Sequence, residues 1–281
     1  MRRNRTTYNL ADVEPYINWL YFYHAWGLSG KPEAEKQRIK AEALDLLHQW
    51  YGRYHTHAVT VLYDANADGD DLLLFPHTDS TEETVRIPML RQQHAVDNGE
   101  PNLCLTDYVR PLAQGIRDKV ALFCVSVDAE PQQLFHGDEY VEMQAQTLCD
   151  RLAEATVEKL HEEVRRTWWG YAPHEQLTLQ QLFHGDYQGI RPAVGYPSLP
   201  DVSVNFLIEP LLQMGQIGIR LTQSGMMMPH SSVSGFMFAH PKARYFSLGK
   251  IDTEQLTDYA RRRGIPVSLM KRYLQSSLIK R

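Results

Sequence analysis

A long helical pattern from about Asp138 to Trp169 constrains the fold of this 281-residue chain more than any other feature. Apolar side chains recur on one face at helical spacing, and Glu and Arg fill the opposite face. The apolar stripe comprises Leu148, Leu152, Ala155, Leu160, Val164 and Trp168. Gly170 favours a stop at the C-terminal end, as does Pro173. At 1.5 Å per residue this helix would be about 45 Å long, enough to form the spine of a single domain.

The sequence before this helix predicts one helix and several strands. A helix is expected over 33–51, where apolar residues recur at helical spacing. Strands are expected over 58–63, 71–75 and 84–90, and the turn sequence NADGDD predicts that they form an antiparallel meander. A further strand is expected over 121–127. Helices and strands do not alternate regularly, so we expect an α+β domain.

The C-terminal part predicts more strands and two helices. Strands are expected over 217–221, 232–239 and 245–251, the last two as a hairpin across the HPKAR connection. Asp252 is expected to cap a helix that ends near Gly264, and a final helix follows Pro266. We expect residues 1–281 to form one domain, with residues 1–15 as a flexible N-terminal extension.

The composition of the chain bears on whether it binds nucleic acid, spans a membrane or is secreted. The net charge is −5, so no general nucleic-acid-binding surface is indicated. No apolar run approaches the roughly 20 residues that span a bilayer, and the basic start lacks the apolar core of a secretion signal. The three cysteines are far apart and show no CxxC spacing, so a reducing cytoplasm is the expected location.

Sequence motifs indicate no catalytic residue and no metal site. Phosphate-binding glycine loops and the GxSxG nucleophile elbow are both absent from the sequence. His55 and His57 form an HxH pair, but no third ligand is evident. A solvated strand end is the favoured interpretation of this pair.

The loop GIRPAVGYPSLPD, residues 189–201, is rich in residues that restrict the backbone. Three prolines fix φ, and two glycines permit tight bends or close approach to a ligand. The loop should therefore hold Arg191 and Tyr196 in set places. This pair suits a small anionic or aromatic ligand, although a rigid structural connector remains an alternative.

The stretch from Tyr259 to Leu274 suggests a different function. Its spacing is similar to a helix-turn-helix, and it carries Arg261, Arg262, Arg263, Lys271 and Arg272. These charges could meet DNA phosphates. The acidic net charge and Pro266, just before the would-be recognition helix, favour a solvated helical hairpin instead.

Several segments, in the same order and spacing, resemble the activation (reactivation) domain of cobalamin-dependent methionine synthase. The RxxxGY motif is met by Arg191, Gly195 and Tyr196. Within the predicted spine helix, the segment DRLAEA and the terminal segment WGYAP also match the family. Further along the chain, VSGFMFAHPKARYF and DYARRRG match it as well. NLCLTDYV and LRQQ are smaller matches. The similarity extends from about Tyr16 to Leu274. It implies a single C-shaped α+β domain with a central twisted antiparallel sheet, a long spine helix and a C-terminal helical pair.

The resemblance also implies a site for S-adenosylmethionine in a shallow groove. Arg191 would hold the methionine carboxylate, and Glu154 would favour the sulfonium or ammonium charge. Asp150 would face the cobalamin domain. The residues that would border the ligand are Ala193, Gly195, Tyr196, Tyr245 and Phe246.

Two positions depart from the family pattern. Asn18 stands where the family usually has an Asp that takes the ligand's amino group, and Phe246 lacks the hydroxyl of the usual Tyr-Tyr pair. An Asn can accept the same hydrogen bond but supplies no charge, which predicts weaker binding of the methyl donor.

The implied function is reductive methylation of cob(II)alamin in methionine biosynthesis. The chain would act on a separate cobalamin-binding methionine synthase subunit or domain, with a flavodoxin-like electron donor. It would position a methyl group and contribute no nucleophile or base. The alternatives are an S-adenosylmethionine sensor, a reactivator of another corrinoid methyltransferase, and a helix-turn-helix regulator. No membrane or nucleic-acid partner is expected.

Overall fold

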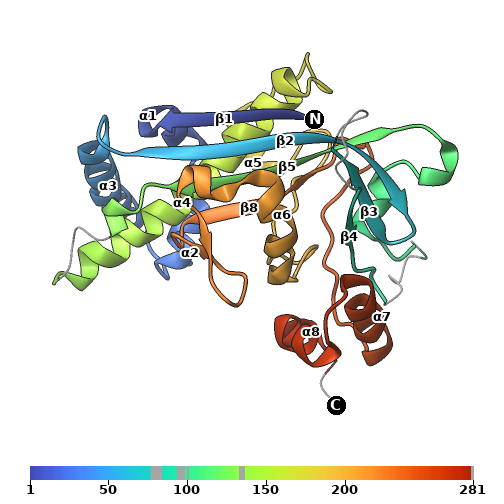
Figure 1. Cartoon of the computed structure of the whole chain (residues 1–281). Coiled ribbons are helices and arrows are strands. Elements are labelled where there is room, and N and C mark those ends of the chain that lie inside the picture. Colours follow the sequence, from blue (N-terminus) through green and yellow to red (C-terminus); the bar gives the residue numbers. More distant parts are fainter. Residues whose placement is uncertain (77–83, 94–98, 100, 133–136, 280–281) are drawn as a thin grey trace.

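A curled antiparallel sheet forms the centre of the molecule (Figure 1). The computed structural model describes residues 1–76, 84–93, 99, 101–132 and 137–279. The strand order is β4-β3-β2-β5-β8, and β1 also pairs with β2. The strands are β1 (Arg2–Asn9), β2 (His55–Asp68), β3 (Asp71–Phe75), β4 (Val85–Pro88), β5 (Asp118–Val127) and β8 (Ser232–Met237). Every pairing in this sheet is antiparallel, which confirms the expected meander of β2, β3 and β4.

Helices cover the sheet and extend from one end of it (Figure 1). The α-helices are α1 (Leu10–Val13), α2 (Trp19–Ala25), α3 (Glu33–Trp50), α4 (Glu139–Glu163), α5 (Leu179–His184), α6 (Asn205–Leu212), α7 (Thr253–Arg263) and α8 (Val267–Tyr273). The predicted spine helix is confirmed as α4, which continues into a π-helical turn over Val164–Trp168. The C-terminal pair is confirmed as α7, capped by Asp252 and ended by Gly264, and α8.

The sheet is buried on both faces, because side chains of β5 alternate between two apolar cores. Phe123 and Val125 pack with α3 and α4 in one core, whereas Leu122 and Cys124 pack with α6 in the other. This explains why β5 is apolar at nearly every position rather than at every second one. A third, smaller core joins α7 and α8. The expected single α+β domain is thus observed. None of the described helices is long and apolar enough to cross a membrane.

The expectation of a flexible extension over residues 1–15 is wrong. Residues Arg2–Asn9 form β1, which pairs with residues 55–62 of β2. Further along the same edge of β2, residues 64–68 pair with β3. Tyr8 is buried, and its hydroxyl donates a hydrogen bond to Glu163 at 2.6 Å. The polar composition of β1 concealed the strand, because an edge strand needs few apolar side chains.

The hairpin expected across the HPKAR connection is also wrong. Residues 245–250 form no strand, because another segment already occupies the free edge of β8. Ile190 exchanges two backbone hydrogen bonds with Phe238 (3.0 and 2.9 Å), and the nitrogen of Val194 donates to Ser234 at 2.8 Å. The 189–201 loop therefore takes the place of the predicted hairpin partner.

The strand expected over 217–221 is present only in part. Met214–Ile217 is a 3-10 turn, and only Arg220–Leu221 is extended (β6). This short strand pairs with β7 (Met227–Met228) in a sheet separate from the central one.

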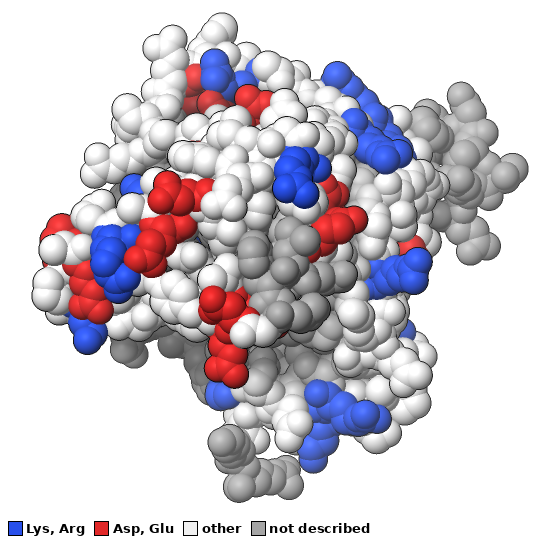
Figure 2. All heavy atoms as spheres, turned by 90° about the vertical axis from the view of Figure 1, so that its left-hand side faces the viewer, with Lys and Arg blue, Asp and Glu red and all other residues white. Residues whose placement is uncertain are grey.

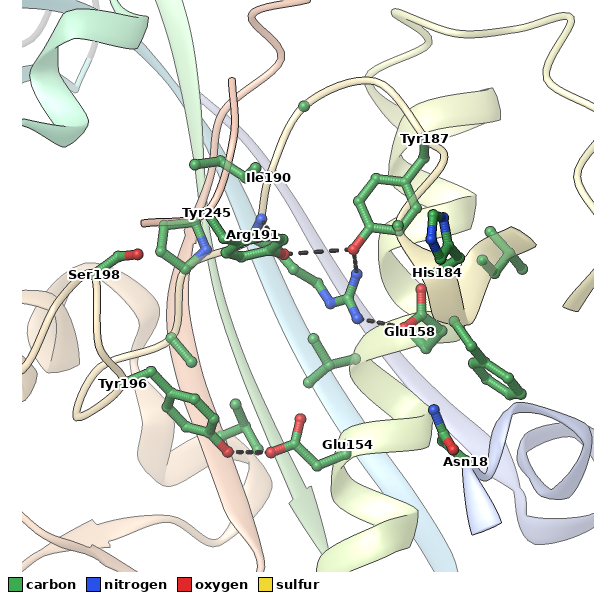
Figure 3. A pocket seen from close by; sticks show the side chains of 18 of the residues that line it. Asn18, Glu154, Glu158, His184, Tyr187, Ile190, Arg191, Tyr196, Ser198 and Tyr245 are labelled. Carbon is green, nitrogen blue, oxygen red and sulfur yellow. Dashed lines mark hydrogen bonds and ion pairs between the residues drawn. The ribbon is translucent and has the colours of Figure 1, made fainter. Parts of the chain in front are cut away.

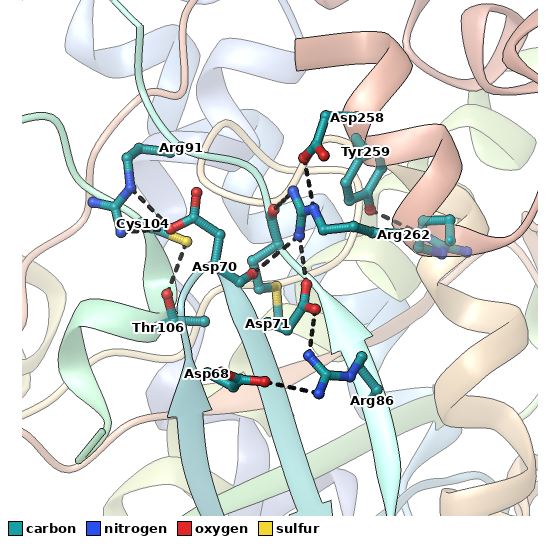
Figure 4. A network of polar contacts seen from close by, with 12 residues as sticks. Asp68, Asp70, Asp71, Arg86, Arg91, Cys104, Thr106, Asp258, Tyr259 and Arg262 are labelled. Atoms are coloured by element: carbon teal, nitrogen blue, oxygen red, sulfur yellow. Dashed lines mark hydrogen bonds and ion pairs between the residues drawn. The ribbon is translucent and has the colours of Figure 1, made fainter. Parts of the chain in front are cut away.

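Ion pairs fasten α7 to the β3–β4 hairpin (Figure 4) and to the 189–201 loop. Arg262 contacts Asp71 at 2.5 Å and Asp258 at 2.7 Å. Arg263 contacts Asp201 at 2.6 Å, and both side chains are almost fully buried. Two of the five basic residues that suggested a DNA-binding patch, Arg262 and Arg263, are thus used inside the fold, whereas Arg261, Lys271 and Arg272 are exposed. On the face shown in Figure 2, described acidic and basic side chains are mixed on the left and in the centre, whereas the charged side chains toward the right and at the lower right are mostly basic.

The close contact between the loop and β8 predicts a specific sensitivity at Gly235. A Cβ atom there would lie 2.2 Å from the carbonyl oxygen of Pro192 and 2.9 Å from the Cα of Ala193, both of which are backbone atoms. We expect Gly235→Ala to lower the free energy of unfolding by about 1–3 kcal/mol or more. Gly215→Ala is the control, since an added Cβ there meets no atom within 4 Å. Urea denaturation measures both variants, and equal stability of the two would contradict this packing.

Candidate functional site

A groove of about 950 Å³ lies where α2, α4, α5 and the 189–201 loop meet (Figure 3). Polar and aromatic side chains from these elements line it together with residues 243–247. The lining residues include Asn18, Glu154, Glu158, His184, Tyr187, Arg191, Ala193, Tyr196, Ser198, Tyr245 and Phe246. This volume falls in the range of small-molecule sites, which is roughly 300–1,000 Å³.

The loop is ordered by backbone contacts with β8 and by its own turns. Gly189 has φ 85°, and a Cβ there would lie 2.3 Å from the carbonyl oxygen of Phe238. Only glycine fits such a position without strain. Gly195 also has a positive φ, and its nitrogen donates to the carbonyl of Leu199 at 2.8 Å. The loop therefore presents Arg191 and Tyr196 from a fixed backbone.

Arg191 reaches from this backbone toward α4. Its guanidinium forms an ion pair with Glu158, donates to the hydroxyl of Tyr187 and lies 3.3 Å from Nδ1 of His161. Burial alone would lower the pKa of Arg191, but Tyr245, Tyr187 and Glu158 keep it above its usual value. The site therefore holds a permanent cation that is largely shielded from solvent.

His161 supports Arg191 as a neutral acceptor. Burial, with the charges of Arg165 and Arg191, holds the pKa of His161 well below its usual value. Because a guanidinium can only donate, Nδ1 accepts from Arg191 and the ring proton lies on Nε2. Nε2 then donates to the hydroxyl of Tyr171, 3.1 Å away.

Two tyrosines of the groove, Tyr196 and Tyr245, are held in place by hydrogen bonds of their hydroxyl groups. The hydroxyl of Tyr196 donates to Glu154 of α4, and that of Tyr245 accepts from the backbone nitrogen of Arg191 at 3.0 Å. Phe246 is held through its backbone, since its nitrogen donates to Ser198 at 3.3 Å. The missing hydroxyl of Phe246 thus leaves this backbone contact intact.

Most of the residues expected at the site line this one groove: Asn18, Glu154, Arg191, Ala193, Tyr196, Tyr245 and Phe246. Gly195 and Asp150 instead line a smaller adjoining cavity of about 320 Å³. In that cavity, Asp150 accepts a hydrogen bond from Ser231 at 2.6 Å and lies 3.4 Å from Nδ1 of His230.

Asn18 is the N-cap of α2, and its Oδ1 accepts a hydrogen bond from the nitrogen of Leu20 at 3.1 Å. This contact identifies which side-chain atom is the oxygen, because only an oxygen can accept there. The amide oxygen that could receive a ligand's amino group therefore already accepts one hydrogen bond, of the two that it can accept.

Glu158, Tyr187 and His161 were not anticipated from the sequence. Glu158 lies one helical turn after Glu154, and residues at i and i+4 share a face of a helix. That spacing could have indicated Glu158. No sequence pattern indicated Tyr187 or His161, because their contacts with Arg191 depend on how the loop folds back on α4.

The HxH pair lies apart from the groove. Nε2 of His57 contacts Asp128 at 2.8 Å, and His55 lies 3.9 Å from the same carboxylate. Among the described residues, no three His, Cys, Asp or Glu side chains are grouped to hold a metal ion.

Comparison with known proteins agrees with this geometry. Residues 9–264 match the family model described as "Vitamin B12 dependent methionine synthase, activation domain". A crystal structure of the MetH reactivation domain bound to AdoHcy is 34% identical and superposes with a TM-score of 0.93. The match covers 100% of this chain and 91% of that chain. The chain therefore belongs to the family of activation domains of vitamin B12-dependent methionine synthase.

Proposed function

We propose that this chain binds S-adenosylmethionine and supports reductive methylation of cob(II)alamin held by a cobalamin-binding subunit or domain of methionine synthase. The observation that carries the proposal is the buried, charged Arg191 at a groove large enough for the ligand. The similar MetH domain binds AdoHcy, which is the demethylated form of the same compound.

The residues of the groove fit such a ligand. Arg191 offers a planar pair of donors that matches a carboxylate. The backbone at Ala193 and the rings of Tyr196 and Tyr245 would border the ligand. Glu154 adds a carboxylate that favours the positive sulfonium or ammonium group.

The chain's contribution is positioning. When bound, S-adenosylmethionine supplies an electrophilic methyl group, and reduced cobalamin supplies the nucleophile. A fixed loop and a rigid helix on opposite sides would hold the methyl group in one orientation, and such positioning contributes several kcal/mol to catalysis. No general acid or base is required from this chain.

The partners follow from the same proposal. Asp150, in the cavity beside the groove, would face the cobalamin-binding partner. A flavodoxin-like protein would supply the electron, and the three buried cysteines suit a reducing cytoplasm.

The alternative functions would give different experimental results. A sensor, or a reactivator of another corrinoid methyltransferase, would bind S-adenosylmethionine without restoring methionine synthase activity. A helix-turn-helix regulator would bind duplex DNA with strong salt dependence. The internal ion pairs of Arg262 and Arg263 disfavour the regulator.

Arg191→Gln should weaken binding of S-adenosylmethionine by about tenfold or more, because a charge-assisted contact with the carboxylate is lost. Arg166→Gln is the control, since Arg166 is an exposed residue paired with Glu162. Isothermal titration calorimetry measures both variants. Equal affinity of wild type and Arg191→Gln would contradict the assigned role of Arg191.

Asn18→Asp should tighten binding of S-adenosylmethionine by about 1 kcal/mol, or roughly fivefold, because it adds a charge facing the amino group. Aspartate also caps helices well, so α2 should be retained. Asn9→Asp makes the same charge change outside the groove and should leave affinity unchanged. An unchanged affinity in Asn18→Asp would show that this position does not limit binding.

The chain should restore activity when it is mixed with a methionine synthase that lacks its activation domain, a reductant and S-adenosylmethionine. Methionine formation after oxidation of the cobalamin is the readout. Omission of S-adenosylmethionine is the control and should give no recovery. Binding of the ligand without recovery with a cognate partner would favour the sensor.

A further inference from the structure

Glu158 is a buried acid that the proposed function does not use. It lies on α4, one turn after Glu154, and only 7% of its surface is exposed. One carboxylate oxygen pairs with Arg191, whereas Oε1 has no hydrogen-bond partner among the described residues. An unsatisfied buried acceptor on a charged group costs free energy. A donor that reaches this oxygen would therefore be bound favourably.

Burial disfavours the charged form of Glu158, and its arginine neighbours favour it. Burial raises the pKa of Glu158, while Arg191 and Arg165 oppose that rise. Glu158 is also a lining residue of the groove, and in the view of Figure 3 it lies between Arg191 and Asn18. A carboxylate that is ion-paired with Arg191 thus lines the same groove as residue 18, which provides no charge.

We propose that Glu158 is the acceptor for the α-ammonium group of the ligand, in place of the residue at position 18. This inference rests on the proposed function and specifies how its site recognises an amino acid. Asn18 is less suited to the task, because it carries no charge and its oxygen already accepts one hydrogen bond as the cap of α2. Glu158 lines the groove, and an ammonium group bound to its second oxygen would leave the first oxygen on Arg191.

The pair of Arg191 and Glu158 is complementary to an amino-acid zwitterion. Arg191 faces the ligand carboxylate, and Glu158 faces the ligand ammonium, so each charge has an opposite neighbour. The charges of Arg191, Glu158 and the amino-acid end of the ligand sum to zero, so this end adds no net charge to a shielded site. A ligand without the ammonium group would leave the second oxygen of Glu158 unsatisfied, as it is in the free protein.

A purely structural role makes a different prediction. If Glu158 only orients Arg191, its loss should weaken every ligand that carries the carboxylate. If Glu158 binds the ammonium group, its loss should weaken binding only of ligands that carry that group. Two probes separate these roles: S-adenosylhomocysteine, and its analogue in which hydrogen replaces the α-amino group.

The test is calorimetric titration of both probes into wild type and Glu158→Gln. Glutamine keeps the shape and an oxygen for Arg191. We expect Glu158→Gln to bind S-adenosylhomocysteine about tenfold more weakly or worse, with little change for the desamino analogue. An equal loss for both probes, or no loss for either, would overturn the role proposed for Glu158. Wild type that binds neither probe would overturn the proposed function as well.

A double variant provides rescue and guards against misfolding. Asn18→Asp in the Glu158→Gln background returns a carboxylate to the groove and should restore much of the lost affinity. The same substitution should increase affinity less in wild type, where two carboxylates would face one ammonium.

If Glu158→Gln does not fold, Glu158→Asp is used, because it keeps the charge beside Arg191 but withdraws it by one methylene. Unchanged discrimination between the probes in Glu158→Asp would overturn the proposal.

Discussion

The backbone pairing between the 189–201 loop and the free edge of β8 is the interaction on which the site depends. Hydrogen bonds at Ile190 and Val194 fix the chain on both sides of Arg191. Because β8 is paired on its other edge with β5, the loop in effect continues the central sheet. A glycine at position 235 is required for this approach, since any side chain would meet loop backbone. The sheet thus supplies the rigidity that a groove between loop and helix needs.

The far end of the loop is secured by a different kind of contact. Asp201 accepts hydrogen bonds from Arg263 at 2.6 Å and from the hydroxyl of Tyr259 at 2.8 Å, deep between the loop and α7. Such buried charges are costly unless fully paired, and removal of one partner is strongly destabilising. This network accounts for Arg263, and the neighbouring Arg262 pairs internally with Asp71. Arg261, Lys271 and Arg272 of the same stretch are exposed.

The sequence allowed much of the fold to be predicted and a smaller part of the site. Helical periodicity and caps were sufficient for α3, α4 and α7, because these signals are local. The edge strand β1 and the missing hairpin partner of β8 were wrongly predicted, because pairing between distant segments leaves no local pattern. For the same reason the resemblance indicated Arg191 and Glu154, but not Glu158, whose role emerges only when the loop folds against α4.

The contacting pair of opposite charges in the groove, Arg191 from the loop and Glu158 from α4, is the central claim. A crystal structure of this chain with S-adenosylhomocysteine tests it most directly. We predict that the ligand carboxylate lies within hydrogen-bond distance of the Arg191 guanidinium, and that the ligand ammonium contacts Glu158. An amino-acid end that lies elsewhere, with the pair of Arg191 and Glu158 untouched by ligand, would contradict the claim.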